Sequence, residues 1–280
     1  METQQVFLVD AFADEPLGGV AVPVLPDRSV SRTQLRQVAR EFGAPGAVAP
    51  GEEGLRYSAD GTGTPVCAAV SGAVGCGESR GADSETQTLR CDDGTELSVT
   101  LEDDRTVQVS VDQSVTVADI APDAVAEALS VPASAVTDVD VPVGYAEGFG
   151  GTLLVPLMFL EHLGDSNCDA RSLDTLPGER LFAFTFDTLA PETDVHARLF
   201  DADGRERAAS GLGASGCATF LAAQGAVADD WIRVESGRFC DRPATLDAMC
   251  SDGTIAGSAL ISLEGTVAVP ADGDDDIVEL

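Results

Sequence analysis

Cysteine is the residue type in this sequence best suited to proton transfer, and Cys67 stands in the most favourable surroundings. Residues 66–77 are small or apolar and carry no charge, which predicts a helix that is enclosed on all sides. A thiol beside the first turn of a helix lies near free N–H groups that lower its pKa. We therefore treat Cys67 as a candidate acid–base residue. The alternative is that it is a small buried hydrophobe, as cysteine often is.

The other thiols and the two histidines, His162 and His196, do not form a metal or disulfide pattern. The number of cysteines is odd, their spacing is irregular and no CxxC pair occurs. We therefore expect no zinc site, no disulfide framework and no cofactor. His196 lies in an alternating apolar segment, where a histidine is more often half-buried or solvated than catalytic. The remaining cysteines are Cys76, Cys91, Cys168, Cys217, Cys240 and Cys250.

Acidic residues far outnumber basic ones, at 48 against 16, for a formal net charge of −32. The acids are dispersed along the chain, and only Asp274, Asp275 and Asp276 form a short run. A dispersed excess favours adaptation of the whole surface to molar salt over a cation-binding tract, because salt at 1 M screens self-repulsion beyond about 3 Å. We therefore expect a protein of a salt-loving organism that needs salt to stay folded. The same charge predicts that neither nucleic acid nor an anionic membrane is a partner.

The start of the chain, METQQVFLVD, lacks the basic residues and the apolar core of a signal peptide. No apolar run approaches the roughly 20 residues that a membrane span requires. Together with cysteines that show no disulfide pattern, these features predict a cytoplasmic protein with reduced thiols.

The pattern of predicted elements occurs twice along the chain. Each half has strands, a helix of small uncharged residues (66–77 and 215–224) and further strands. Because a helix with no polar face must be enclosed, we expect a curved sheet around it in each half. The sequence therefore predicts an α+β fold of two pseudo-symmetric lobes, each a curved, mainly antiparallel sheet or barrel wrapped around a central helix. Residues 1–115 would form the N-terminal lobe, 116–270 the C-terminal lobe and 271–280 an acidic tail.

Peripheral elements and the place of a site follow from the same patterns. Ser31 can cap a helix over residues 31–42, which Gly43 ends. Residues 121–129 predict another helix, and residues 136–145 read as a strand. We expect the site in the cleft between the lobes, where the N-terminal ends of the two central helices offer free N–H groups to a carboxylate ligand.

Five phrases in order carry a resemblance to a known family. They are VDAFADEPLGGVAVPVL at 9–25, AREF at 39–42, LLVPL at 153–157, DVHARLFDADG at 194–204 and VESGRFCDRPATL at 234–246. In their order and spacing, these phrases resemble the phenazine-biosynthesis isomerase (PhzF-like) family, a branch of the diaminopimelate-epimerase-like fold. The resemblance runs from about residue 9 to residue 269.

The resemblance implies a homodimeric, cofactor-free isomerase of a small carboxylated metabolite. In that family a glutamate after the AREF-like phrase moves the proton, and its place here falls near Gly46. The family phrase at the first central helix is P-F-(A/C)-G-H-P-T-L-G, and with its first proline at Pro65 the histidine becomes Ala69. The aspartate of the second helix phrase becomes Ala209 or Ser210. Since neither Gly46 nor Ala69 can titrate, proton transfer by the family's glutamate is not expected.

The starts of the two central helices supply the remaining candidate ligand contacts. Ser71 and Ser215 could donate hydrogen bonds to a ligand carboxylate, although plain helix capping would also explain them. Gly72, Gly213 and Ala214 complete the predicted substrate-binding set. Two functions stay open: an isomerase or epimerase whose chemistry departs from that of the family, and a catalytically inactive relative that binds a small acid or acts as a dimeric partner.

Overall fold

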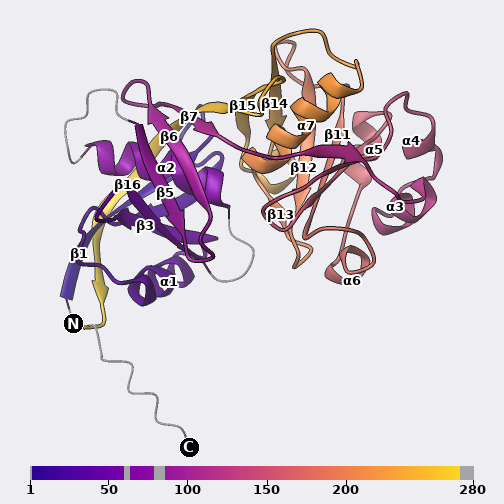
Figure 1. Cartoon of the computed structure of the whole chain (residues 1–280). Coiled ribbons are helices and arrows are strands. Elements are labelled where there is room, and N and C mark those ends of the chain that lie inside the picture. The colour runs from indigo at the N-terminus through magenta and orange to yellow at the C-terminus, as the bar shows by residue number, and fades with distance from the viewer. Residues whose placement is uncertain (1, 60–63, 79–85, 272–280) are drawn as a thin grey trace, which may run out of the picture.

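The computed structural model describes residues 2–59, 64–78 and 86–271, and these form two lobes that lie side by side (Figure 1). Each lobe is a curved, mainly antiparallel sheet around one central helix. The fold class predicted from the sequence is therefore confirmed.

The first lobe is a closed barrel. Its strands follow the order β1-β2-β3-β4-β5-β6-β7-β16, and β16 pairs back onto β1. Burial alternates along these strands, so that in β6 Leu97 and Val99 point into the barrel while Glu96 and Ser98 face solvent. The strands are β1 (Glu2–Ala11), β2 (Val20–Val24), β3 (Gly46–Pro50), β4 (Leu55–Ala59), β5 (Thr86–Cys91), β6 (Glu96–Leu101), β7 (Thr106–Ser110) and β16 (Ile255–Val269).

Helix α2 (Pro65–Glu78) fills this barrel, which confirms the enclosed helix predicted at 66–77. Its small residues allow the barrel wall to approach closely. A Cβ added to Gly72 would lie 2.7 Å from Cγ1 of Val48, and one added to Gly75 would lie 3.0 Å from Val24. The run of glycine, alanine and cysteine is therefore a packing requirement of the barrel interior.

Helix α1 (Arg32–Glu41) covers the outside of the barrel (Figure 1). Ser31 caps it by accepting the N–H of Gln34, whose side chain accepts the N–H of Ser31 in return. Gly43 follows the helix with a φ of 61°, a conformation that favours glycine. The predicted cap and stop are both confirmed.

The second lobe is an open sheet around α7 (Gly211–Ala223). The order is β15-β14-β12-β11-β10-β9-β8, and within the described residues β8 pairs only with β9. The strands are β8 (Val115–Val117), β9 (Gly144–Ala146), β10 (Thr152–Pro156), β11 (Arg180–Thr185), β12 (Val195–Phe200), β13 (Glu206–Arg207), β14 (Trp231–Ser236) and β15 (Ala244–Met249).

Short helices cover the outer face of this second sheet: α3 (Pro122–Ala128), α4 (Ser134–Thr137), α5 (Leu160–Asp165) and α6 (Ala170–Leu173). A further short helix, η1 (Arg238–Cys240), links β14 to β15. The prediction of a helix at 121–129 is confirmed by α3. The strand expected at 136–145 is wrong except at β9, because Ala135 and Val136 turn into α4 and pack under α3.

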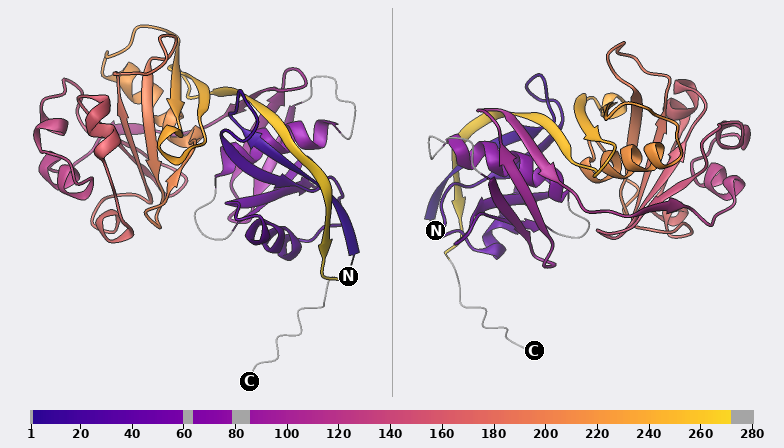
Figure 2. Two further views of the ribbon diagram at one scale, coloured as in Figure 1. Left: turned by 180° about the vertical axis from the view of Figure 1, so that it is seen from behind. Right: turned by 45° about the horizontal axis from the view of Figure 1, so that its top comes forward.

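Strand β16 connects the two lobes. Its first residues, Ile255 and Ala256, pair with both β15 and β7, and most of the remainder pairs with β1 (Figure 2). The lobes are therefore not two consecutive stretches of sequence, because the last strand of the chain returns to close the first barrel. Among the described residues, no helix is long and apolar enough to cross a membrane.

Candidate functional site

The N-terminal ends of α2 and α7 meet between the lobes. Helix α2 begins at Pro65, a residue whose fixed φ and missing N–H suit the first turn. Helix α7 begins at Gly211 rather than at 215, and Ser210 caps it by accepting the N–H of Gly213 at 3.0 Å. A Cβ on Gly211 would lie 2.3 Å from Cγ1 of Val66, so the two helix ends are in close contact.

Cys67 lies in the first turn of α2, at this junction, and is 1% exposed. Its thiol points to the carbonyl of Ala209 at 3.9 Å. Burial raises the pKa of Cys67 to about 12 and outweighs the lowering by the backbone N–H groups of Gly211 and Cys67. The thiol is thus protonated at neutral pH, contrary to the lowered pKa expected of a helix start.

The junction itself holds almost no free space. A cavity of about 10 Å³ lies between the helix ends, lined by Thr64, Cys67, Arg180 and Ser210 among others. Such a volume holds roughly one water molecule. The hydroxyl oxygen of Thr64 is buried and has no hydrogen-bond partner in the described part of the chain. A metabolite therefore does not fit between the helix ends in this conformation.

At Gly46, the position predicted for the family's glutamate, the ring of Tyr57 fills the space that a side chain would need. A Cβ on Gly46 would lie 2.3 Å from Cε2 and 2.5 Å from the hydroxyl oxygen of Tyr57. Tyr57 is 3% exposed, accepts the N–H of Thr64 at 3.0 Å and donates to the carbonyl of Pro45 at 3.3 Å. No larger residue fits at 46 unless Tyr57 moves.

The position predicted for the family's histidine lies inside the barrel. Ala69 stands there on α2 and is fully buried. Its methyl group supplies no imidazole, and the loss of the family's histidine stays a prediction from the resemblance.

The predicted ligand contacts on α2 lie within the barrel. Ser71 is fully buried and donates to the carbonyl of Val9 at 3.3 Å. Gly72 faces Val48 and Leu55. Helix α2 starts six residues before Ser71, so both residues lie beyond its first turn, and substrate contact by them stays a prediction that this packing does not support.

The predicted contacts on α7 lie nearer the junction but are enclosed by the second lobe. Gly213 packs its Cα against Phe182, and Ala214 is fully buried. Ser215 is 1% exposed, its hydroxyl has no partner in the described residues, and it lies beside Gly253. A role of these three residues in substrate binding also stays a prediction.

A larger cavity, of about 380 Å³, lies beside the junction between the two lobes. The first lobe contributes Tyr57, Asp93 and Thr95, and the second contributes Glu179 and Arg180. This volume is within the range of small-molecule sites. The cavity is therefore the part of the junction that has room for a metabolite.

Arg180 borders both cavities and was not singled out by the sequence. It opens β11, is 6% exposed, and donates through Nη1 to the carbonyl of Phe149. Burial lowers the pKa of Arg180, but an arginine remains charged in proteins at any physiological pH. A guanidinium pairs well with carboxylates, and this one shares the larger cavity with Asp92, Asp93 and Glu179. In the sequence, Arg180 is recognisable only as an arginine that directly precedes a run of apolar residues.

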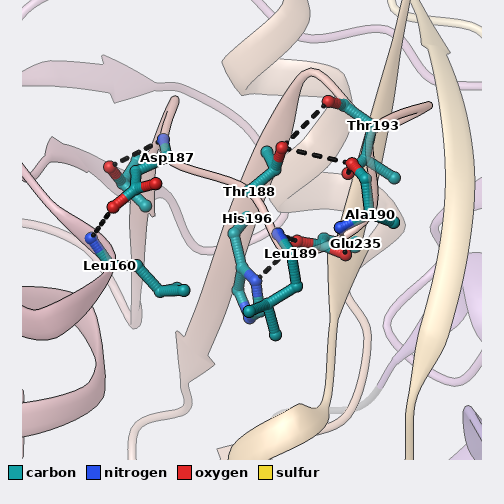
Figure 3. A network of polar contacts seen from close by, with 9 residues as sticks. Leu160, Asp187, Thr188, Leu189, Ala190, Thr193, His196 and Glu235 are labelled. Carbon is teal, nitrogen blue, oxygen red and sulfur yellow. Dashed lines mark hydrogen bonds and ion pairs between the residues drawn. The ribbon is translucent and has the colours of Figure 1, made fainter.

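His196 belongs to a separate polar network on the outer face of the second sheet (Figure 3). It is fully buried, so the expectation that it is half-buried or solvated is wrong. Its Nδ1 lies 2.8 Å from Glu235, which also accepts the N–H groups of Leu189 and Ala190 at 2.6 and 3.3 Å. Burial lowers the pKa of His196, which keeps the ring neutral. His196 lines neither junction cavity.

The fold has clear counterparts among solved structures, although no protein-family model and no curated protein matches the sequence. A PhzF-family phenazine biosynthesis protein of Bacillus anthracis aligns with a TM-score of 0.80 at 16% identity, over 96% of this chain and 100% of that one. A predicted epimerase of Pseudomonas aeruginosa gives 0.75 at 21% identity, over 94% and 99%. A probable proline racemase of Agrobacterium radiobacter, with bound carbonate, gives 0.57 at 13% identity, over 98% and 94%. The chain therefore has, over nearly its whole length, the fold of PhzF-family proteins and of proline-racemase-like epimerases.

Proposed function

We propose that this protein is a cofactor-independent isomerase or epimerase that moves a proton on a small carboxylated metabolite at the junction of its lobes. The observation that carries the proposal is a 380 Å³ cavity between the lobes that is bordered by the buried guanidinium of Arg180. The names of the structural counterparts, a PhzF-family protein, an epimerase and a racemase, support the reaction class.

The chemistry must differ from that of the family. Proton transfer needs a titratable group within reach of the reacting carbon, and Gly46 supplies none. Cys67 is the remaining acid–base group in the first turn of α2. Its raised pKa keeps it protonated in this conformation, and it becomes a base only if the ligand or a movement of the lobes brings positive charge closer.

The second candidate is a catalytically inactive relative that binds a small acid. Two features of the junction favour it: the cavity at the helix ends holds about 10 Å³, and the Cys67 thiol is buried and protonated. In that case, binding of a small acid beside Arg180 is the whole function. The other form of this candidate is a protein that acts as a dimeric partner.

Solvent-proton exchange separates the two candidates. The protein is incubated in deuterated buffer at molar salt with small amino, hydroxy and unsaturated carboxylates, and deuterium is followed by NMR and mass spectrometry. Incorporation that wild type catalyses and Cys67→Ala loses, by 100-fold or more, supports the thiol mechanism. Incorporation that Cys67→Ala retains assigns the reaction to another group. Binding without any incorporation identifies the inactive relative.

We also propose that the protein is a homodimer of the cytoplasm and is adapted to molar salt. The dispersed net charge of −32 supports the salt adaptation, the seven cysteines without a disulfide support the cytoplasm, and the dimer rests on the resemblance to the PhzF-like family. Light scattering after gel filtration at 3 M and 0.1 M salt tests them. A monomer at both salt concentrations contradicts the dimer. Thermal unfolding is followed at the same two concentrations, and an unchanged melting temperature contradicts the adaptation to salt.

A further inference from the structure

Tyr57 occupies space that a ligand or a catalytic side chain would otherwise fill. Its ring lies over the Cα of Gly46, where a Cβ would approach the ring and hydroxyl to between 2.3 and 2.5 Å. The ring comes from β4, and Gly46 opens the neighbouring strand β3. Glycine at 46 and tyrosine at 57 are therefore complementary in shape, and neither tolerates enlargement of the other.

The hydroxyl of Tyr57 acts at the start of α2. It accepts the N–H of Thr64, the residue that precedes the helix, at 3.0 Å. Free N–H groups at a helix start are where a ligand anion binds. Burial raises the pKa of Tyr57, so a neutral phenol oxygen, and not a ligand carboxylate, meets this donor.

The same tyrosine also forms one wall of the 380 Å³ cavity, with Arg180 on the other lobe. Both side chains are more than nine-tenths buried, at 3% and 6% exposed. Arg180 also borders the 10 Å³ cavity at the helix ends. Tyr57 thus lines the outer cavity, which has room for a ligand, and its hydroxyl holds the N–H of Thr64, which lines the small inner cavity.

We propose that Tyr57 is a specificity-determining residue, which closes the helix end of the cleft and confines a ligand carboxylate to the outer cavity beside Arg180. The proposal rests on the proposed function in one respect, that the ligand is a small carboxylate. It goes beyond that function because it names the residue that sets how deep the ligand lies. The expected ligand is one whose carboxylate contacts Arg180 and leaves the N–H of Thr64 untouched.

Removal of the phenol should open the inner part. In Tyr57→Ala, benzoate matches the lost ring in size, and its carboxylate replaces the phenol oxygen opposite the N–H of Thr64. Benzoate is titrated in molar salt into ¹⁵N-labelled wild type and variant, with the Thr64 amide and the Arg180 side-chain resonances followed by NMR. We expect at least tenfold tighter binding in Tyr57→Ala, with a shift of the Thr64 amide that wild type does not show.

Further variants keep the test decisive if Tyr57→Ala is unstable. Gly46→Ala places a methyl group against the ring and should displace it, with the same shift of the Thr64 amide. Tyr145→Ala removes the other tyrosine, which lines neither junction cavity, and should bind benzoate as wild type does. Introduced alone into the wild-type chain, Arg180→Met should weaken benzoate binding by tenfold or more.

The outcomes separate this inference from the proposed function. A benzoate-induced shift of the Thr64 amide in wild type overturns the role of Tyr57. Equal affinity for benzoate in wild type, folded Tyr57→Ala and folded Gly46→Ala also overturns it. New binding in Tyr57→Ala or Gly46→Ala supports it, even where wild type binds no benzoate and catalyses no deuterium exchange. Those last two results would count against the proposed function alone.

Discussion

The two lobes enclose their central helices in different ways. In the first lobe, β16 pairs with β1 and closes a barrel around α2. In the second, the sheet around α7 ends at β8, and α3 to α6 cover its outer face. The first lobe thus has a closed interior and a smaller apolar cluster under α1, whereas four short helices cover the outer face of the second sheet.

The two lobes also hold their buried charges in different surroundings. The core around α2 is mainly apolar, with Ser71 and Gln87 among its buried polar residues, and the fully buried Asp10 of β1 pairs with Arg242. The outer face of the second sheet carries His196, Glu235 and Arg198, all 9% exposed or less. The backbone groups of a closed barrel are mostly paired within the sheet, whereas loops and short helices over a sheet offer buried side chains carbonyls and carboxylates as partners. We therefore expect polar substitutions to be most damaging in the second lobe and steric ones in the first.

The largest expected effect comes from Arg198 in the second lobe. Its guanidinium donates to the carbonyls of Leu163 and Ser166 at 2.9 and 2.6 Å and to Glu206 at 2.6 Å. Arg198→Met leaves Glu206 half-buried without its partner and should lower the free energy of unfolding by about 3 kcal/mol. Denaturant unfolding at molar salt measures this loss.

An exposed ion pair in the same lobe provides the control. Arg233 contacts both carboxylate oxygens of Asp247, at 2.7 and 2.9 Å, but its side chain is 44% exposed. Arg233→Met should cost less than about 1 kcal/mol. Equal losses for the two variants would contradict the importance of the covered outer face.

Most of the fold could be predicted because its strongest constraints are local. The uncharged helix at 66–77, the cap at Ser31 and the stop at Gly43 each depend on a few neighbouring residues. The path of β16 could not be predicted, because the alternation of buried and exposed residues does not show which lobe a strand joins. The turn of Ser134–Thr137 into α4 was also hidden, since it depends on packing under α3.

The sequence predicted where the candidate site lies but not which residues form it. Two helix starts do meet at the junction, as the repeated pattern indicated. Tyr57 and Arg180 were missed, because each is defined by contacts across strands or lobes that no spacing in the sequence reveals. The pKa of Cys67 moved in the direction opposite to that expected, since the depth of burial outweighs the helix start and is not encoded locally.

A matched pair of glycines tests the steric half of the comparison. A Cβ on Gly72 of α2 would lie 2.7 Å from Cγ1 of Val48, and one on Gly216 of α7 would lie 2.7 Å from Cβ of Ala146. Both helices gain about 1 kcal/mol of propensity from alanine. Overpacking costs about 1–3 kcal/mol, and we expect the upper end in the closed barrel, which cannot widen, and the lower end in the open sheet.

Gly72→Ala should therefore lower the free energy of unfolding by about 2 kcal/mol, and Gly216→Ala should be close to neutral. Both are measured by denaturant unfolding at the same salt concentration. A greater loss for Gly216→Ala would show that closure of the sheet does not govern tolerance to added volume.

The smallest expected effect is a pH dependence confined to the second lobe. Burial lowers the pKa of His196 below its usual value near 6.5, despite the opposing effect of Glu235, while Arg198 and Arg238 lower it further. The unfolded chain therefore binds this proton more readily than the folded one. Stability from His196 is complete above about pH 6.5 and falls on acidification towards the folded pKa, by at most about 1.4 kcal/mol per pH unit.

Hydrogen exchange of β12 and β14 amides between pH 7.5 and 5 should show this loss, which His196→Gln removes. The β6 and β7 amides of the barrel should show no His196-dependent change, and equal sensitivity of both lobes would mean that a global charge effect, and not this buried ring, sets the response.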